Sequence, residues 1–157
     1  MLINNKTYKT IWFDDKKDEI KIIDQTKLPF SFEIVSINNL SDVIKSINSM
    51  QVRGAPLIGA MAAYGVYFAF RELKDKSKID EEVNKIKKTR PTAINLFWAV
   101  ERMLSIINNS LSKIQIEEKL LKEANNICEE DIKSCKRIGK YGLKIIEEIY
   151  NKKGKVN

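Results

Sequence analysis

The sequence predicts an α+β protein in which a small amino-terminal antiparallel sheet packs on a mostly helical domain. Residues 1–36 contain short runs of β-branched and aromatic residues separated by polar turns, a pattern typical of strands. From residue 37 on, apolar residues recur three and four positions apart, which indicates helices. One run, residues 57–70, is almost wholly apolar and rich in Gly and Ala, as expected of a buried helix. We therefore divide the chain into a β subdomain, residues 1–36, and a helical domain, residues 37–157.

The amino-terminal region predicts three strands. Thr7–Phe13 and Glu19–Ile23 flank the polar turn Asp14–Asp18 and indicate a hairpin. Phe30–Val35 alternates apolar and polar residues and predicts a third strand. Three strands alone are marginally stable, so we expect this sheet to pack against the helices that follow.

Two amphipathic helices are predicted on either side of the apolar run. Asn39 or Ser41 can cap the first of them. The second precedes a proline-containing segment. Their apolar positions are Leu40, Val43, Ile44 and Ile47 in the first helix and Ile79, Val83 and Ile86 in the second.

Two further helices complete the helical domain. Pro91 is expected to open an apolar helix, which Ile94, Phe97, Val100, Leu104 and Ile107 continue. A long helix follows, and Gly139 and Gly142 indicate either an interruption of that helix or a tightly packed stretch.

Composition excludes several function classes. The net charge of +7 comes from lysines spread along the chain, so we expect solvated faces and no nucleic-acid surface. No signal peptide and no run long enough to span a membrane is found, so we expect a cytoplasmic protein without a membrane partner. Histidine, the commonest general base and metal ligand, is absent, and we predict no metal and no cofactor.

Cys128 and Cys135 are the two cysteines of the chain. Seven positions along a helix is a rise of about 10 Å, which is too far for a disulfide. We expect both thiols to be small core or near-core residues. For Asp24 and Gln25, which follow a predicted strand, ordinary turn hydrogen bonding is the expectation.

The sharpest signal is the segment Arg53-Gly54-Ala55-Pro56 before the apolar run. Pro56 fits the first helical turn, where a missing N–H costs nothing. The unpaired N–H groups and the positive end of the helix dipole attract an anion there, and an arginine adds a planar fork that suits phosphate. The segment is therefore a candidate phosphate-binding corner. The alternatives are that Arg53 caps a neighbouring helix or pairs with a carboxylate.

Arg90 precedes Pro91 in the same way. The alternative for this residue is an exposed arginine with no ligand. Two arginines at two helix starts can clamp a single anion, but the sequence leaves open whether the two corners converge.

Several segments together resemble the amino-terminal half of the methylthioribose-1-phosphate isomerase family. Its superfamily includes ribose-1,5-bisphosphate isomerase and the alpha, beta and delta regulatory subunits of the exchange factor for translation initiation factor 2. The matching segments are Met50–Gly59, Ala62–Gly65, Thr89–Ala99, the pair Asp24 and Gln25 with Leu28 and Pro29, and Glu130 and Asp131 followed by Arg137–Gly139.

The resemblance implies an aldose–ketose isomerisation in methionine salvage, a route of amino-acid biosynthesis, with a sugar phosphate as substrate. It implies that Arg53, Gly54, Ala55 and Arg90 bind this substrate. The family places its catalytic cysteine and aspartate in a Rossmann-like carboxy-terminal domain, which would begin near residue 155. Neither Cys128 nor Cys135 occupies the place of that catalytic cysteine.

By the resemblance we therefore expect a truncated domain that lacks its carboxy-terminal partner, carries no catalytic residue and is inactive alone. The family is usually homodimeric. The alternatives are a non-catalytic regulatory or scaffold subunit related to the exchange-factor family and a protein resembling ribose-1,5-bisphosphate isomerase.

Overall fold

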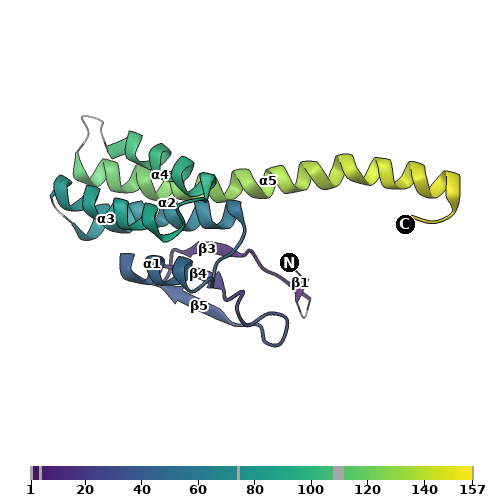
Figure 1. Cartoon of the computed structure of the whole chain (residues 1–157), viewed down its shortest axis with the longest axis horizontal. Coiled ribbons are helices and arrows are strands. Elements are labelled where there is room, and N and C mark those ends of the chain that lie inside the picture. Colours follow the sequence, from purple (N-terminus) through teal and green to yellow (C-terminus); the bar gives the residue numbers. More distant parts are fainter. Residues whose placement is uncertain (1, 4, 74, 108–111, 157) are drawn as a thin grey trace.

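The computed structural model describes residues 2, 3, 5–73, 75–107 and 112–156. A helical layer lies over a small sheet, and one long helix extends away from both (Figure 1). The predicted α+β class, with a small antiparallel sheet packed on helices, is confirmed. The described elements are β1 (Leu2–Ile3), β2 (Lys6–Thr7), β3 (Ile11–Asp14), β4 (Glu19–Ile23), β5 (Ile34–Ile37), α1 (Leu40–Asn48), α2 (Ala55–Glu72), α3 (Lys76–Thr89), α4 (Ile94–Ile107) and α5 (Lys113–Lys153).

The main sheet is antiparallel with the order β3-β4-β5, and β1 and β2 form a separate pair. In the central strand Ile20 lies opposite Phe13 on one side and Ile37 on the other. The predicted hairpin is confirmed, although its first long strand begins at Ile11 rather than at residue 7. The third strand runs over Ile34–Ile37, so the prediction of a strand from residue 30 to residue 35 is wrong at both ends. Phe30 is 96% exposed, and its N–H bonds back to Lys27, because residues 27–30 form a turn.

Helix α2 is the centre of the core. Every residue from Leu57 to Phe70 is buried, as the apolar run predicts. Two glycines allow neighbouring helices to come close to it. A Cβ on Gly59 would lie 2.9 Å from the carbonyl oxygen of Asn95 in α4. A Cβ on Gly65 would lie 2.8 Å from Ile86 in α3 and 3.0 Å from a methyl group of Val43 in α1.

The sheet and the helices share one apolar cluster. Ile11, Ile20, Ile22 and Ile37 of the sheet belong to the same buried cluster as the side chains of α2. Burying apolar surface against the helices is what a sheet of three strands needs for stability. The division at residue 36 stays a prediction.

Helix α5 begins at a capping box formed by Ser112 and Gln115. The expectation that Gly139 and Gly142 interrupt or tightly pack this helix is wrong, because α5 is continuous from Lys113 to Lys153. A Cβ on either glycine would meet no atom within 4 Å. The carboxy-terminal half of α5 projects from the helical layer (Figure 1). Its exposed apolar side chains are Ile138, Tyr141, Leu143, Ile145, Ile146 and Tyr150.

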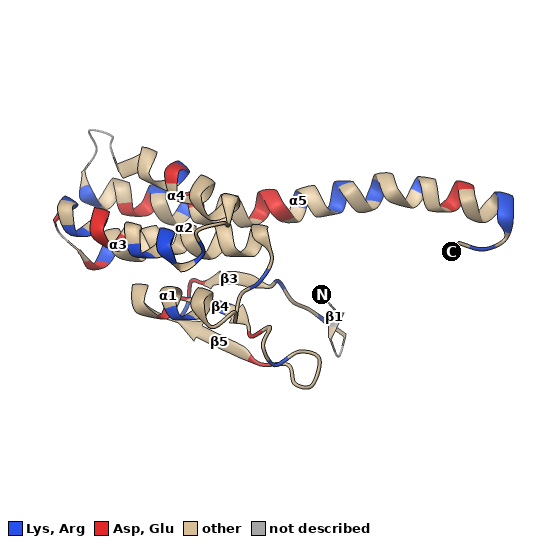
Figure 2. Cartoon of the chain, in the orientation of Figure 1, with Lys and Arg blue, Asp and Glu red and all other residues tan. Residues whose placement is uncertain are grey.

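Basic and acidic residues are interspersed along α3, α4 and α5 (Figure 2). Several of them pair between elements. Arg102 of α4 forms ion pairs with Glu123 and Glu130 of α5, which joins these two helices. Within the described ranges, no helix combines the length and the apolar character that crossing a membrane requires.

Candidate functional site

The chain enters α2 through a turn with two left-handed residues. Met50 has φ of 60° and Gly54 has φ of 88°. Gly54 is the N-cap of α2, and no side chain caps this end. A Cβ on Gly54 would meet nothing within 4 Å, so the position selects glycine for its backbone conformation and not for lack of space. Ala55 and Pro56 are exposed, and Pro56 lies in the first turn as predicted.

Other helices of the chain satisfy their first N–H groups with their own side chains. Asn39 caps α1, Asp75 caps α3 and Ser112 caps α5. By contrast, no side chain caps α2. The amino terminus of α2 therefore presents N–H groups and the positive end of a helix dipole, the combination that binds anions.

Arg53 lies directly before this helix start with an exposed side chain. Its Nη2 atom donates a hydrogen bond of 2.9 Å to the carbonyl oxygen of Gln25. The ion pairs found among the described residues involve other cations, and neither Arg53 nor Arg90 takes part in one. The bond from Arg53 goes to a carbonyl oxygen in a turn, so Arg53 does not cap a neighbouring helix. It also forms no ion pair with a carboxylate among the described residues, so both alternatives for Arg53 are wrong. A guanidinium has five N–H donors, so most of its bonding capacity stays available to a ligand.

Arg90 lies at the carboxyl end of α3 and is half-buried. Its carbonyl oxygen accepts a hydrogen bond of 3.0 Å from the N–H of Ala93, which turns the chain into α4. Helix α4 begins at Ile94, so the expectation that Pro91 opens this helix is wrong. Pro91 lies in the turn that precedes it.

The starts of α2 and α4 meet at Gly59 and Asn95, the close approach described above. Pro56, Gly59 and Asn95 line one hollow of about 200 Å³, together with Trp98, Ile127, Glu130, Asp131 and Ser134. Neither Arg53 nor Arg90 is among the described residues that line this hollow. The structure thus brings the two helix starts together, while the two guanidinium groups lie outside the hollow between them.

Asp24 links its own turn to the turn before α2, which the sequence did not predict. The residue is only 3% exposed. Oδ1 accepts hydrogen bonds from the N–H and the hydroxyl of Thr26, which is the expected turn bonding. Oδ2 accepts a bond of 2.9 Å from Nε2 of Gln51, in the turn before α2. Burial raises the pKa of Asp24, but the bonds from Thr26 and Gln51 outweigh burial and leave this pKa below its usual value.

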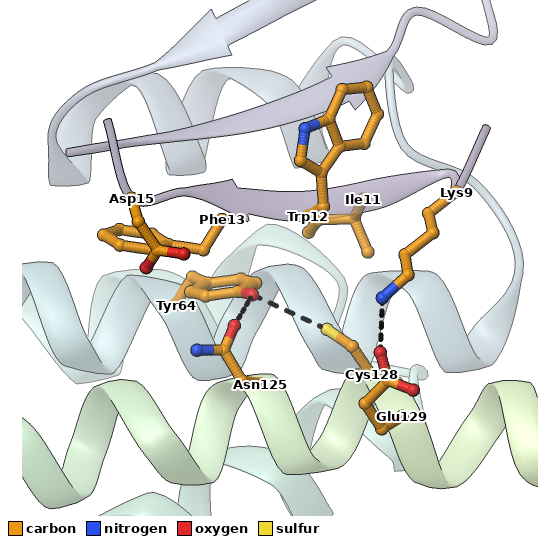
Figure 3. A pocket seen from close by; sticks show the side chains of 9 residues that line it. All are labelled: Lys9, Ile11, Trp12, Phe13, Asp15, Tyr64, Asn125, Cys128 and Glu129. Atoms are coloured by element: carbon orange, nitrogen blue, oxygen red, sulfur yellow. Dashed lines mark hydrogen bonds and ion pairs between the residues drawn. The ribbon is translucent and has the colours of Figure 1, made fainter. Parts of the chain in front are cut away.

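A second hollow, of about 210 Å³, lies between β3, α2 and α5 (Figure 3). Tyr64 donates a hydrogen bond of 2.7 Å to Oδ1 of Asn125, and the Cys128 thiol points at the Tyr64 hydroxyl from 3.9 Å. Lys9 and Glu129 form an ion pair at its edge. Burial raises the pKa of Tyr64, and it raises the pKa of Cys128 to about 11. Near neutral pH both groups keep their protons, so this cluster offers no ready nucleophile.

The predicted burial of the two cysteines is half right. Cys128 is buried in the core, but Cys135 is exposed on α5. Among the described residues, no three Cys, Asp or Glu side chains are grouped so that they could hold a metal ion.

Comparison with known proteins places this fold and these segments among relatives. Residues 51–152 match the model of the initiation factor 2 subunit family. A methylthioribose-1-phosphate isomerase of Methylorubrum extorquens is 42% identical over 158 residues, covering 100% of this chain and 43% of the relative. The chain thus spans less than half the length of this curated relative.

Two solved structures share the fold. The 5-methylthioribose 1-phosphate isomerase of Pyrococcus horikoshii superposes with a TM-score of 0.80 at 30% identity, over 89% of this chain and 41% of that one. The delta subunit of the translation initiation factor eIF-2B from A. fulgidus gives a TM-score of 0.71 at 34% identity, over 80% of this chain and 38% of that one. The resemblance found in the sequence motifs is confirmed, and the chain belongs to the initiation factor 2 subunit family.

Proposed function

We propose that this chain is the sugar-phosphate-binding part of a cytoplasmic aldose–ketose isomerase that converts 5-methylthioribose 1-phosphate to 5-methylthioribulose 1-phosphate in methionine salvage. The observation that carries this proposal is the uncapped amino terminus of α2, preceded by an exposed arginine that has no carboxylate partner among the described residues. A relative named as this isomerase matches 100% of this chain at 42% identity.

In this proposal the phosphate ester sits on the backbone N–H groups that follow Gly54, with Arg53 and Arg90 as the two cations around it. Ala55 leaves the approach to these N–H groups unobstructed, since its side chain is a single methyl group. The close contact between Gly59 and Asn95 supports the pairing, because it brings the segments that follow both arginines to one junction.

In the proposed isomerisation, the phosphate site at the start of α2 would hold the substrate in place. The phosphate is on the anomeric carbon, the ring must open, and hydrogen must move between two neighbouring carbons while the ester stays intact. A fixed phosphate therefore also fixes the position of the reacting carbons, which is the kind of orientation that accelerates a reaction. By resemblance, the catalytic cysteine and aspartate belong to a carboxy-terminal domain. We therefore propose that the residues described here bind the substrate and that the groups that turn it over belong to that domain.

We further propose two protein partners, the carboxy-terminal domain of the family and a second copy in a homodimer. The exposed apolar side chains on the projecting half of α5 support a packing partner, and Ile138 is 72% exposed. The interspersed charges of Figure 2 support the absence of a nucleic-acid partner. Sedimentation of the chain alone, and with an added carboxy-terminal domain, tests both associations.

A titration tests the binding proposal. ¹⁵N-labelled protein is titrated with ribose 1-phosphate, and ribose at the same concentration serves as the control for the ester. The proposal expects saturable shifts at the amides of Gly54 and Ala55 and at the side chains of Arg53 and Arg90. Shifts that do not saturate, or that occur equally with ribose, would contradict it.

The second candidate is a regulatory or scaffold subunit, which the likeness to the eIF-2B delta subunit favours. Such a subunit needs no sugar-phosphate site. Complete absence of ribose 1-phosphate binding, with the fold intact, would favour this candidate. A ribose-1,5-bisphosphate isomerase is the third reading, and tighter binding of the bisphosphate than of the monophosphate would support it.

A further inference from the structure

We propose that the buried Asp24 carboxylate, through Gln51, is a positioning group that holds Arg53 ready to bind the phosphate ester. This inference rests on the phosphate-binding role proposed above for Arg53. Asp24 itself is not assigned any contact with the ligand, and neither is Gln51.

Two loops that are distant in the sequence are joined here by three hydrogen bonds. The side chain of Gln51 donates to Oδ2 of Asp24 over 2.9 Å. The N–H of Gln25 donates to the carbonyl oxygen of Gln51 over 3.0 Å. The guanidinium of Arg53 then donates to the carbonyl oxygen of Gln25 over 2.9 Å. The loop that Asp24 organises is therefore the surface on which the Arg53 side chain rests.

The bond between Gln51 and Asp24 is not needed for the local turn. Thr26 already supplies Oδ1 of Asp24 with two donors, at 2.9 Å from its N–H and 2.6 Å from its hydroxyl, and these close the turn. A buried carboxylate is costly unless its oxygens are satisfied. Oδ2 instead accepts its hydrogen bond from Gln51, which is distant in the sequence and lies two positions before Arg53.

Val52 makes this connection rigid. It lies between Gln51 and Arg53 and is fully buried, and its N–H bonds to the carbonyl oxygen of Ser46. Gln51 and Arg53 therefore flank a point that is fixed in the core. With Gln51 bonded to Asp24 on one side of this point, the Arg53 backbone and the first part of its side chain have little freedom left.

Positioning matters because arginine is a long and flexible side chain. Ordering one such side chain on binding costs about 0.5–1.5 kcal/mol, which corresponds to roughly a 2- to 12-fold change in affinity. An Arg53 that is already held on Gln25 avoids much of this cost. We therefore expect the loss of the Gln51–Asp24 bond to weaken ribose 1-phosphate binding about 3- to 10-fold, within the range set by that cost.

Exchange of the two side-chain types gives a sharp test. In Gln51→Glu, two carboxylates face each other across the former 2.9 Å bond and repel. In the double variant Gln51→Glu with Asp24→Asn, the amide of the new asparagine donates to the new glutamate, and the bond re-forms in reverse. The single variant Asp24→Asn can keep the contact if the amide of Gln51 rotates. Lys140→Ala, on the exposed part of α5, is the control for loss of one charge elsewhere.

Two readouts are measured on each variant. The first is the affinity for ribose 1-phosphate relative to the wild type at the same pH. The second is the ¹⁵N heteronuclear NOE of Arg53 and Gly54 without ligand, which reports their mobility. We expect Gln51→Glu to bind about 3- to 10-fold more weakly at pH 7.5, to show a more mobile Arg53, and to recover toward the wild-type ratio near pH 5, where one carboxylate of the pair takes up a proton. We expect the double variant to recover at both pH values.

The inference is overturned if Gln51→Glu leaves both affinity and Arg53 mobility unchanged, or if the double variant is as impaired as the single one. A wild type that does not bind ribose 1-phosphate would refute the proposed function instead. In that case the mobility of Arg53 across the same variants still decides whether Asp24 and Gln51 position it. Thermal unfolding of each variant confirms that the comparison is made on folded protein.

Discussion

Gly59 and Gly139 both lie inside helices, but only Gly59 faces another backbone. Replacing glycine by alanine within a helix gains about 1 kcal/mol of local preference. At Gly139 the added Cβ meets no atom within 4 Å, so this gain is retained. At Gly59 the Cβ would lie 2.9 Å from the carbonyl oxygen of Asn95 and 3.3 Å from its carbonyl carbon. Both are backbone atoms, so the start of α4 must move away.

Overpacking of this kind costs about 1–3 kcal/mol. We therefore predict that Gly139→Ala is more stable than the wild type by up to about 1 kcal/mol. We predict that Gly59→Ala is less stable than Gly139→Ala by about 1–3 kcal/mol. For a chain of this size, 1 kcal/mol shifts the melting temperature by about 2–4 °C.

Urea unfolding followed by circular dichroism measures both variants against the wild type. Because the same contact joins the two helix starts, Gly59→Ala is also expected to weaken ribose 1-phosphate binding, whereas Gly139→Ala is not. Equal stability of the two variants would refute the close approach of α2 and α4 at this point.

Three other predictions follow from single residues. Gly54→Ala forces an L-residue to φ of 88°, which costs about 1–3 kcal/mol in unfolding free energy and no steric clash, and urea unfolding against Gly142→Ala measures it. The lowered pKa of Asp24 stabilises the fold above the pKa of the unfolded chain, so the advantage of the wild type over Asp24→Asn should be constant at pH 5–7 and shrink below about pH 4, as unfolding at each pH would show. Iodoacetamide at pH 8 should modify the exposed Cys135 and spare the buried Cys128, whose pKa is raised to about 11, and mass spectrometry of the digested protein would reveal a reactive Cys128 if this is wrong.

Local patterns predicted much of the fold because they report local causes. The apolar run of residues 57–70 identified the core helix, since no other place in a folded chain accommodates so continuous an apolar surface. Of the two candidate caps, Asn39 and Ser41, the structure has Asn39 at the start of α1, whereas Ser41 lies inside the helix. Gly139 and Gly142 were misread because a glycine in a sequence does not reveal whether another element lies against it.

The amino terminus of α2, where we propose that phosphate binds, was predicted in part for the same reason. The Arg53 segment combines its features within four consecutive residues, so the uncapped start of α2 could be expected. The bond from Gln51 to Asp24 could not, because it joins residues 27 positions apart and depends on how two loops pack. The expectation for Asp24, ordinary turn bonding, described only one of its two oxygens.

A double-mutant cycle on Arg53 and Arg90 tests the central claim most directly, with ribose 1-phosphate affinity as the readout and Lys140→Ala as the charge control. We predict that Arg53→Ala and Arg90→Ala each weaken binding about 10- to 100-fold, as expected for hydrogen bonds to a charged group. Because both cations would hold the same phosphate, the two effects should be coupled by at least about 0.5 kcal/mol. Losses that simply add, or arginine variants that bind as well as Lys140→Ala, would contradict a shared phosphate site.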